Sequence, residues 1–139
     1  MENRKVYEVV AAVIVKDGDI LAAQRGYGDF KGKWEFPGGK MKAGETREQA
    51  LKREIKEVLL AEIDILNYLT TVNYEYPDFD LIMHTYICSL LDDAQFVYHN
   101  DSELEHDNLI WLDNEDLEHV DWLPADVELI KAYQNTLHA

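Results

Sequence analysis

The stretch that decides the fold is residues 39–61, which reads GKMKAGETREQALKREIKEVLLA. A helix is predicted to begin near Thr46, because Thr46 and Gln49 have the spacing of a capping box, in which each side chain binds the other residue's backbone N–H. Apolar residues then recur at helical spacing and give this helix one apolar face, formed by Ala50, Leu51, Ile55, Val58 and Leu59. The stretch therefore predicts a glycine-containing turn followed by an amphipathic helix.

Two carboxylates stand out on this helix. Glu54 and Glu57 are three residues apart and share one side, about 60° from each other, opposite the apolar stripe. Mg²⁺ takes oxygen ligands and is usually shared between a few carboxylates and substrate phosphates, so the pair beside the glycine turn is a reasonable metal site. Taken alone, the two carboxylates are more simply interpreted as part of a solvated helix face. The sequence pattern around them favours a metal site instead.

Residues 39–61 resemble the Nudix box, whose pattern is Gly, five residues, Glu, seven residues, Arg-Glu-hydrophobic-any-Glu-Glu-any-Gly-hydrophobic. The residues that fill their places are Gly39, Glu45, Arg53, Glu54, Ile55, Glu57 and Ala61. The preceding WEFPGGK at 34–40 is similar to the segment that enters the box in the MutT-like branch. The similarity continues in Gln24-Arg25, in YEYPD at 74–78 and in LPAD at 123–126.

Two positions depart from the box. Val58 stands where the pattern has its second adjacent Glu, which in the family is among the principal metal ligands. Val58 falls at the border between the carboxylate side and the apolar stripe, where it can pack into the core. Leu60 stands where the pattern has Gly, a residue suited to a left-handed helix end, so the helix is expected to end differently here.

The resemblance implies an α/β fold, a Nudix α/β/α sandwich with a mixed β-sheet, formed by residues 1–139 as one domain. The residues themselves agree with this. Two apolar runs, 6–15 and 20–24, surround an Asp-Gly turn and predict a β-hairpin. The further expected strands are 34–36, 63–76, 81–90 and 108–112, and the further expected helices are 113–118 and 125–137. This order predicts a mixed sheet covered by helices on both faces.

The resemblance also implies a metal site and the catalytic residues. Its ligands would be Glu54, Glu57, the carbonyl of Gly38 and Glu105 from a later loop, holding Mg²⁺ with Mn²⁺ as a substitute. Glu54 and Glu57 would be catalytic, and Glu54 would also activate water. Gly38 can instead be a plain turn glycine. Glu105 can be a surface acid, and Glu103 is its near rival.

Substrate binding is implied for Arg25, Glu35, Phe36, Pro37, Gly38, Tyr76 and Asp126. Arg25 would bind phosphate through two hydrogen bonds, although it can also be an exposed charged residue of a loop. Phe36 and Tyr76 would flank the base, unless they belong to the core. Asp126 would read the base edge, because an ionised Asp accepts from an amino group such as that of cytosine. An ordinary acid in the first turn of a helix is the alternative for Asp126.

Two more inferences concern residues near these. Glu45 and Arg53 resemble the pair that braces the loop against the helix, which is a structural role. His84 and His106 suggest no partner, and a lone histidine is more often structural.

The function that the resemblance implies is Mg²⁺-dependent hydrolysis of (deoxy)nucleoside triphosphates to monophosphate and pyrophosphate, which would sanitise the nucleotide pool. Two alternatives remain open. Val58 motivates a degenerate Nudix domain that binds nucleotides without efficient hydrolysis. The other alternative is a Nudix hydrolase of nucleotide sugars or dinucleotides.

The amino-acid composition limits the kinds of binding partner that we expect. The chain has 28 Asp and Glu against 13 Lys and Arg, a net charge of −15, which argues against duplex nucleic acid and anionic membranes. No segment reaches the roughly 18 apolar residues that a membrane span requires. The lone Cys88 cannot form an internal disulfide, so we expect a cytoplasmic protein. The sequence leaves a monomer and a homodimer equally open.

Overall fold

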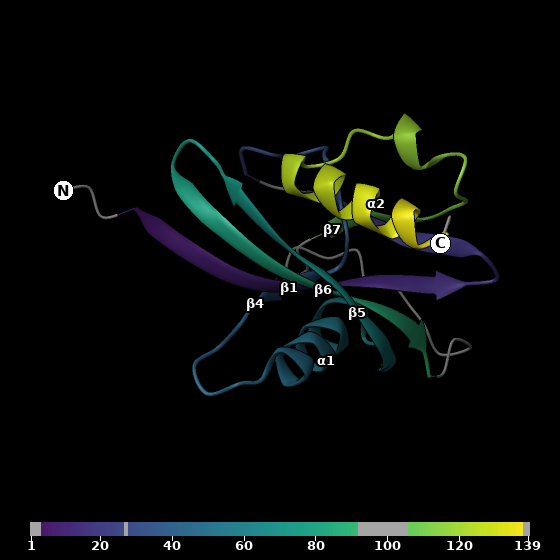
Figure 1. Ribbon diagram of the computed structural model, residues 1–139, viewed down its shortest axis with the longest axis horizontal. Helices are drawn as coiled ribbons and strands as arrows, with labels where there is room; N and C mark the ends of the chain where they lie inside the picture. Colours follow the sequence, from purple (N-terminus) through teal and green to yellow (C-terminus); the bar gives the residue numbers. More distant parts are fainter. Residues whose placement is uncertain (1–3, 27, 92–105, 138–139) are drawn as a thin grey trace.

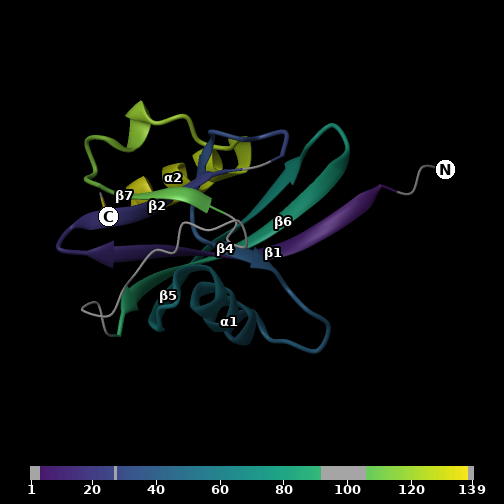
Figure 2. The ribbon, with the colours of Figure 1, turned by 180° about the vertical axis from the view of Figure 1, so that it is seen from behind.

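The computed structural model describes residues 4–26, 28–91 and 106–137. Its strands are β1 (Lys5–Lys16), β2 (Asp19–Arg25), β3 (Trp34–Glu35), β4 (Gly38–Lys40), β5 (Ile63–Glu75), β6 (Phe79–Leu90) and β7 (His106–Leu112). Its helices are α1 (Arg47–Leu59), the short 3₁₀ helix η2 (Leu117–His119) and α2 (Pro124–Leu137). The helices α1 and α2 lie on opposite sides of the sheet (Figures 1 and 2), which confirms the predicted sandwich.

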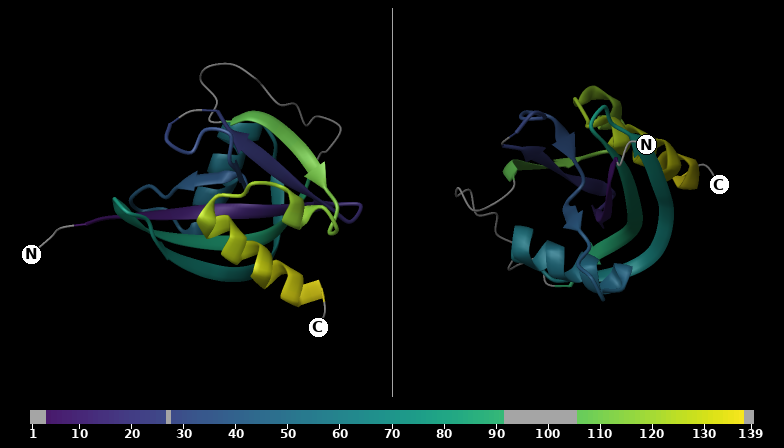
Figure 3. Two further views of the ribbon diagram at one scale, coloured as in Figure 1. Left: turned by 90° about the horizontal axis from the view of Figure 1, so that it is seen from above. Right: turned by 90° about the vertical axis from the view of Figure 1, so that its left-hand side faces the viewer.

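Strand β1 organises the sheet. It runs parallel to β6, from the pair Lys5–Phe79 to the pair Ile14–Cys88, and antiparallel to β2 and β4. β3 and β7 pair with β2, and β5 pairs with β6, all antiparallel. The sheet is therefore mixed, as the sequence predicts. The right-hand view of Figure 3 shows β5 and β6 curving between the two helices.

The β1–β2 hairpin forms as its turn sequence predicts. Asp17 and Gly18 both have a positive φ, 52° and 85°. Two consecutive left-handed residues are the signature of the tight turn whose twist matches that of the flanking strands, and Asp-Gly favours it.

Both faces of β1 are buried, because each covers a separate core. Ala11 and Val13 belong to the cluster under α2, whereas Val10, Ala12 and Ile14 belong to the cluster under α1. The near-continuous apolar run of β1 follows from this double burial. Cys88 is buried in the α1 cluster. None of the helices in the described part of the chain has the length and apolar character needed to cross a membrane.

Helix α1 has the predicted beginning. The Thr46 hydroxyl accepts from the backbone N–H of Gln49 at 3.1 Å, and the Gln49 side chain accepts from the backbone N–H of Thr46 at 2.9 Å. Val58 is 5% exposed and packs into the core, as expected for its border position. The expectation that the helix would end differently is wrong. Leu60 itself adopts the left-handed conformation, with φ 54° and ψ 35°, and donates its N–H to the carbonyl of Lys56.

We expect Leu60→Gly to stabilise the protein. A left-handed conformation costs an L-residue roughly 1–2 kcal/mol, and glycine recovers this less its own chain-entropy penalty of roughly 0.5–1 kcal/mol. The net gain should raise Tm by roughly 2–4 °C. Leu60→Ala is the matched control: it removes the half-exposed side chain but keeps the Cβ, so it should not share the gain. Equal melting temperatures for the two variants would show that the left-handed backbone at Leu60 is not strained.

Candidate active site

The guanidinium of Arg53 lies at the centre of an ionic network on α1. Its Nε and Nη2 donate to the two Glu45 oxygens, at 2.6 and 2.9 Å. Its Nη1 donates to Glu54 at 2.8 Å and to Glu57 at 3.2 Å. Nη2 also binds the backbone carbonyl of Lys40 at 3.0 Å. The predicted Glu45–Arg53 brace is confirmed, and the same side chain also gathers the two carboxylates proposed as metal ligands.

The network has a strong effect on Glu45. Hydrogen bonds from Arg53 and from the backbone N–H of Lys42 favour the ionised carboxylate and lower the pKa of Glu45 to about 2. The same Glu45 contact raises the pKa of Arg53 above its ordinary value. The brace is therefore fully ionised over the neutral range.

The two glycines of β4 allow an unusually close approach of other groups. A Cβ on Gly39 would collide with the Glu54 carboxylate, and a Cβ on Gly38 would collide with the carbonyl oxygen of Val10. Glu54 is consequently buried against β4, with 8% exposure, whereas the Glu57 side chain is mostly exposed. The expectation that both carboxylates project from the side opposite the apolar stripe therefore holds for Glu57 only.

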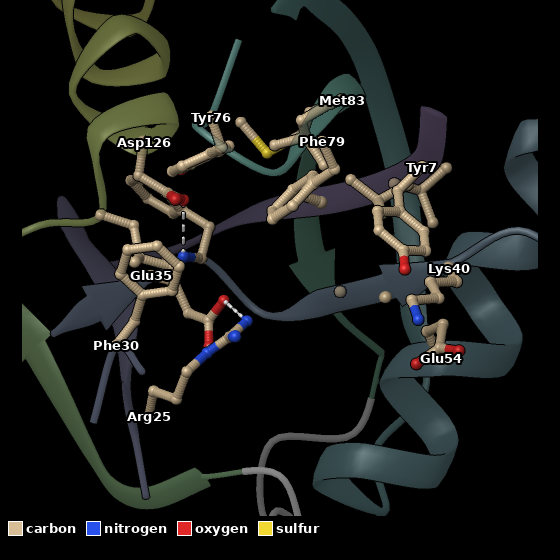
Figure 4. Close-up of a pocket in the computed structure, with 18 of the residues that line it drawn as sticks. Tyr7, Arg25, Phe30, Glu35, Lys40, Glu54, Tyr76, Phe79, Met83 and Asp126 are labelled. Carbon is tan, nitrogen blue, oxygen red and sulfur yellow. Dashed lines mark hydrogen bonds and ion pairs between the residues drawn. The ribbon is translucent and has the colours of Figure 1, made fainter. Parts of the chain in front are cut away.

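A pocket of about 560 Å³ opens beside these glycines. It brings together most of the predicted site residues, namely Arg25, Glu35, Phe36, Gly38, Glu54, Tyr76 and Asp126. Figure 4 shows Glu54 and Lys40 at one end of the pocket and Asp126 at the other, with Tyr76 and Phe79 between them. Pro37 is buried beside the pocket, and neither it nor Glu57 is part of the lining.

Asp126 closes the far end of the pocket. Its Oδ1 accepts from the backbone N–H of Phe36 at 3.0 Å, and its burial, reinforced by the nearby charge of Glu35, raises the pKa of Asp126 well above its usual range. Burial therefore favours the neutral carboxyl, which donates as well as accepts, over the ionised acceptor that the sequence predicts. The Phe36 ring stacks on Trp122, with centroids 4.8 Å apart.

Cations line this pocket despite the acidic balance of the chain. Arg25, Lys40 and Lys42 all contribute to its wall. The Arg25 guanidinium is held by two hydrogen bonds to Glu35, at 3.1 and 3.0 Å. The Lys40 ammonium lies over the ring of Tyr7, 4.4 Å from its centroid. A polyanion entering the pocket would therefore meet local positive charge.

Comparison with known proteins assigns this architecture to a family, because the model of the NUDIX domain matches residues 6–133. The chain belongs to the Nudix family. It is 36% identical to the CTP pyrophosphohydrolase of Escherichia coli strain K12, over 93% of this chain and 92% of that protein. It is 31% identical to the 8-oxo-dGTP diphosphatase of Haemophilus influenzae, over 98% of this chain and 97% of that protein. The solution structure of the E. coli ORF135 protein matches with a TM-score of 0.77 and 34% identity, covering 95% of this chain and 91% of that one.

In this Nudix domain the described donors suit a hard cation shared with a substrate. Glu54 and Glu57 both contact the same Arg53 nitrogen, so their carboxylates lie close together. Across residues 4–26, 28–91 and 106–137 no group of three or more His, Cys, Asp or Glu is arranged to hold a metal ion. Two carboxylates with ligand positions left for phosphate oxygens are the arrangement that Mg²⁺ uses in phosphate-processing enzymes.

Several residues considered in the sequence lie outside the pocket or outside the described part of the chain. Glu103 and Glu105 lie outside the described residues, as does the side chain of His106. His84 is buried and has two partners, the Glu8 carboxylate at 2.6 Å from Nε2 and the Thr71 hydroxyl at 3.0 Å from Nδ1. Its role is structural, as the sequence suggests.

Sequence reasoning missed part of the Nudix pocket wall, notably Tyr7, Phe30, Lys40, Phe79 and Met83. Tyr7 shares one side of β1 with the wall residues Val9 and Ala11, but only the structure shows that this side lines the pocket. Phe79 directly follows the recognised YEYPD motif, but nothing local shows that it faces the pocket.

We expect Glu45→Gln to lower Tm at neutral pH and to lose this effect in acid. The folded-state pKa of Glu45, about 2, lies below the ordinary value of 4.5. The ionised brace therefore stabilises the protein fully above about pH 4.5, and this stabilisation is lost as pH falls through about 2. Melting curves from pH 7 to pH 2 should converge for the wild type and Glu45→Gln. Glu118→Gln, which removes an exposed surface acid, controls for net charge. A difference in Tm between the wild type and Glu45→Gln that stays constant from pH 7 to pH 2 would exclude the ionised brace as its cause.

Proposed function

We propose that this Nudix domain is a Mg²⁺-dependent pyrophosphohydrolase that cleaves (deoxy)nucleoside triphosphates to monophosphate and pyrophosphate. One observation carries the proposal: a single pocket has a buried carboxylate and the two β4 glycines at one end and a buried, hydrogen-bonded carboxyl beside aromatic rings at the other. A nucleotide has matching ends, a polyphosphate and a base. The volume of about 560 Å³ falls within the range of small-molecule sites.

The phosphate end is the end at Gly38, Gly39 and Glu54. Glu54 and Glu57 would hold the metal, together with the Gly38 carbonyl, and Mn²⁺ would serve as a substitute. When bound, the divalent ion neutralises phosphate charge and lowers the pKa of a coordinated water. The chain's own contribution is positioning. Arg53 fixes Glu54 and Glu57, and the absence of a Cβ on Gly39 lets Glu54 lie directly against the strand.

The cations of the pocket would bind phosphate, and the end at Asp126 would bind the base. Arg25 and Lys40 would contact phosphate oxygens, since both line the pocket and Lys40 lies beside Glu54 at the phosphate end. Tyr76 and Phe36 would flank the base, with Asp126 at its edge. Both rings are largely buried, so they offer a preformed wall and lose little entropy when a base binds.

The names of the relatives agree with this substrate class. The E. coli protein is a CTP pyrophosphohydrolase and the H. influenzae protein an 8-oxo-dGTP diphosphatase. We infer a role in sanitising the nucleotide pool. The second candidate is a domain that binds nucleotides with little turnover. Its support is the burial of Val58 in the core under α1, which leaves that position of the box without an oxygen ligand.

The test is pyrophosphate release from a panel of canonical and oxidised nucleoside triphosphates, measured with Mg²⁺, with Mn²⁺ and with excess chelator. We expect release with either metal, none with chelator, and loss in Glu57→Gln. Tight nucleotide binding without release in either metal would select the second candidate. Substantial release in chelator would rule out the metal-dependent mechanism.

Asp126→Asn should change base preference more than turnover of the best substrate. The amide oxygen can still accept from the Phe36 N–H, so the fold should be retained, but the second carboxyl oxygen, which can accept from a base, becomes an NH₂ group that only donates. Because one base-edge contact discriminates by about 1–3 kcal/mol, relative kcat/KM between bases should shift by roughly 10-fold. The measurement is kcat/KM for each base with both proteins. A uniform fall for all bases would instead indicate a folding or phosphate role.

Val58→Glu should raise activity at limiting Mg²⁺ while lowering stability without metal. Burying a charge at this 5% exposed position should cost several kcal/mol, and a metal that binds only the native state should restore part of it. Tm and pyrophosphate release are measured against Mg²⁺ concentration. Val58→Gln is the matched control, polar but uncharged, and should lose stability without gaining metal response. An unchanged metal dependence in Val58→Glu would show that position 58 does not face the site.

A further inference from the structure

The start of β1 lies beside the turn between β5 and β6. Lys5 and Phe79 are partners in the parallel β1–β6 ladder, so Arg4, the residue before β1, is placed at this turn. The turn is closed by a hydrogen bond from the Tyr76 N–H to the Phe79 carbonyl at 2.8 Å. Both of these aromatic residues line the pocket.

The Arg4 guanidinium fastens the turn through several contacts. Its Nη2 donates to the Tyr76 carbonyl at 2.6 Å and its Nη1 to the Pro77 carbonyl at 3.2 Å. Its Nε and Nη2 also bind Oδ1 of Asp80, at 3.2 and 2.9 Å. A planar guanidinium can satisfy these acceptors together, whereas a lysine ammonium presents a single point of charge.

Tyr76 is consequently held at both ends. Its carbonyl is bound by Arg4, and its hydroxyl accepts the backbone N–H of Ala125, in the first turn of α2, at 3.2 Å. Its ring packs against Phe79 at 4.9 Å and against Phe30 at 5.5 Å between centroids. Figure 4 shows Tyr76 and Phe79 side by side along the pocket, away from Glu54.

We infer that Arg4 is a positioning residue for the nucleotide base, a role that rests on the proposed function. It fixes the β5–β6 turn so that Tyr76 and Phe79 present their rings to the base. The phosphate end is built on β4 and α1, which Arg4 does not contact within the described residues. Loss of Arg4 therefore weakens base binding and leaves phosphate binding intact.

The test compares two probes, the non-hydrolysable α,β-methylene analogue of a nucleoside triphosphate and inorganic tripolyphosphate, which lacks a base. Their Kd values are measured in Mg²⁺ for the wild type, Arg4→Gln, Arg4→Lys and Asp80→Asn. Lys5→Gln removes the neighbouring exposed cation and is the charge-matched control. We expect Arg4→Gln to weaken nucleotide binding about 10-fold, roughly the value of one base–ring stack, with tripolyphosphate unchanged within twofold.

Further outcomes decide the role of the contacts. Arg4→Lys should recover only part of the loss, and Arg4→Gln combined with Asp80→Asn should be little worse than Arg4→Gln alone. KM should rise in Arg4→Gln with kcat unchanged. Equal weakening of both probes, or an effect no larger than that of Lys5→Gln, would overturn the positioning role while leaving the proposed function standing. Failure of the wild type to bind the nucleotide more tightly than tripolyphosphate would overturn both.

Discussion

The site depends on one side chain, the Arg53 guanidinium. Three carboxylates converge on it, and in its absence their mutual repulsion would drive them apart. Because it also binds the Lys40 carbonyl, it ties the loop before α1, the helix and strand β4 into one unit. Gly39 follows from this geometry, since a Cβ there would occupy the space of the Glu54 carboxylate, whereas Gly38 is required by the close approach of the Val10 carbonyl on β1.

The position of the pocket follows from the course of β1. This strand pairs with β4 on one side and with β6 on the other, so it brings the β4 glycines and the β5–β6 turn to the same pocket. The start of α2 adds Asp126 at the far end. Glu54 at one end comes from α1 and Asp126 at the other from α2, so the phosphate binding and base recognition that we propose would rest on different helices. The lining cations would offer local positive charge to a polyphosphate, as the proposed function requires of so acidic a chain.

The elements that the sequence predicted well are those set by local chemistry. The Asp-Gly hairpin, the Thr46–Gln49 capping box and the Glu45–Arg53 brace each depend on residues close in the chain. The pocket wall was harder, because Tyr7 and Phe79 meet only through parallel pairing between distant strands, which leaves no local pattern. Burial of Glu54 was missed because it depends on β4, and the left-handed Leu60 was missed because the end of the helix imposes a conformation that leucine itself disfavours.

The most direct measurement is pyrophosphate release by Arg53→Lys at saturating Mg²⁺, with folding checked by Tm. Lysine keeps the positive charge but cannot bind three carboxylates and a carbonyl in one plane. Displacement of positioned groups by about 1 Å can cost roughly 100-fold in rate, so we predict a fall in kcat of that order in a protein that remains folded. An Arg53→Lys variant with kcat close to the wild type would contradict the account, because the two carboxylates would then be positioned without the guanidinium.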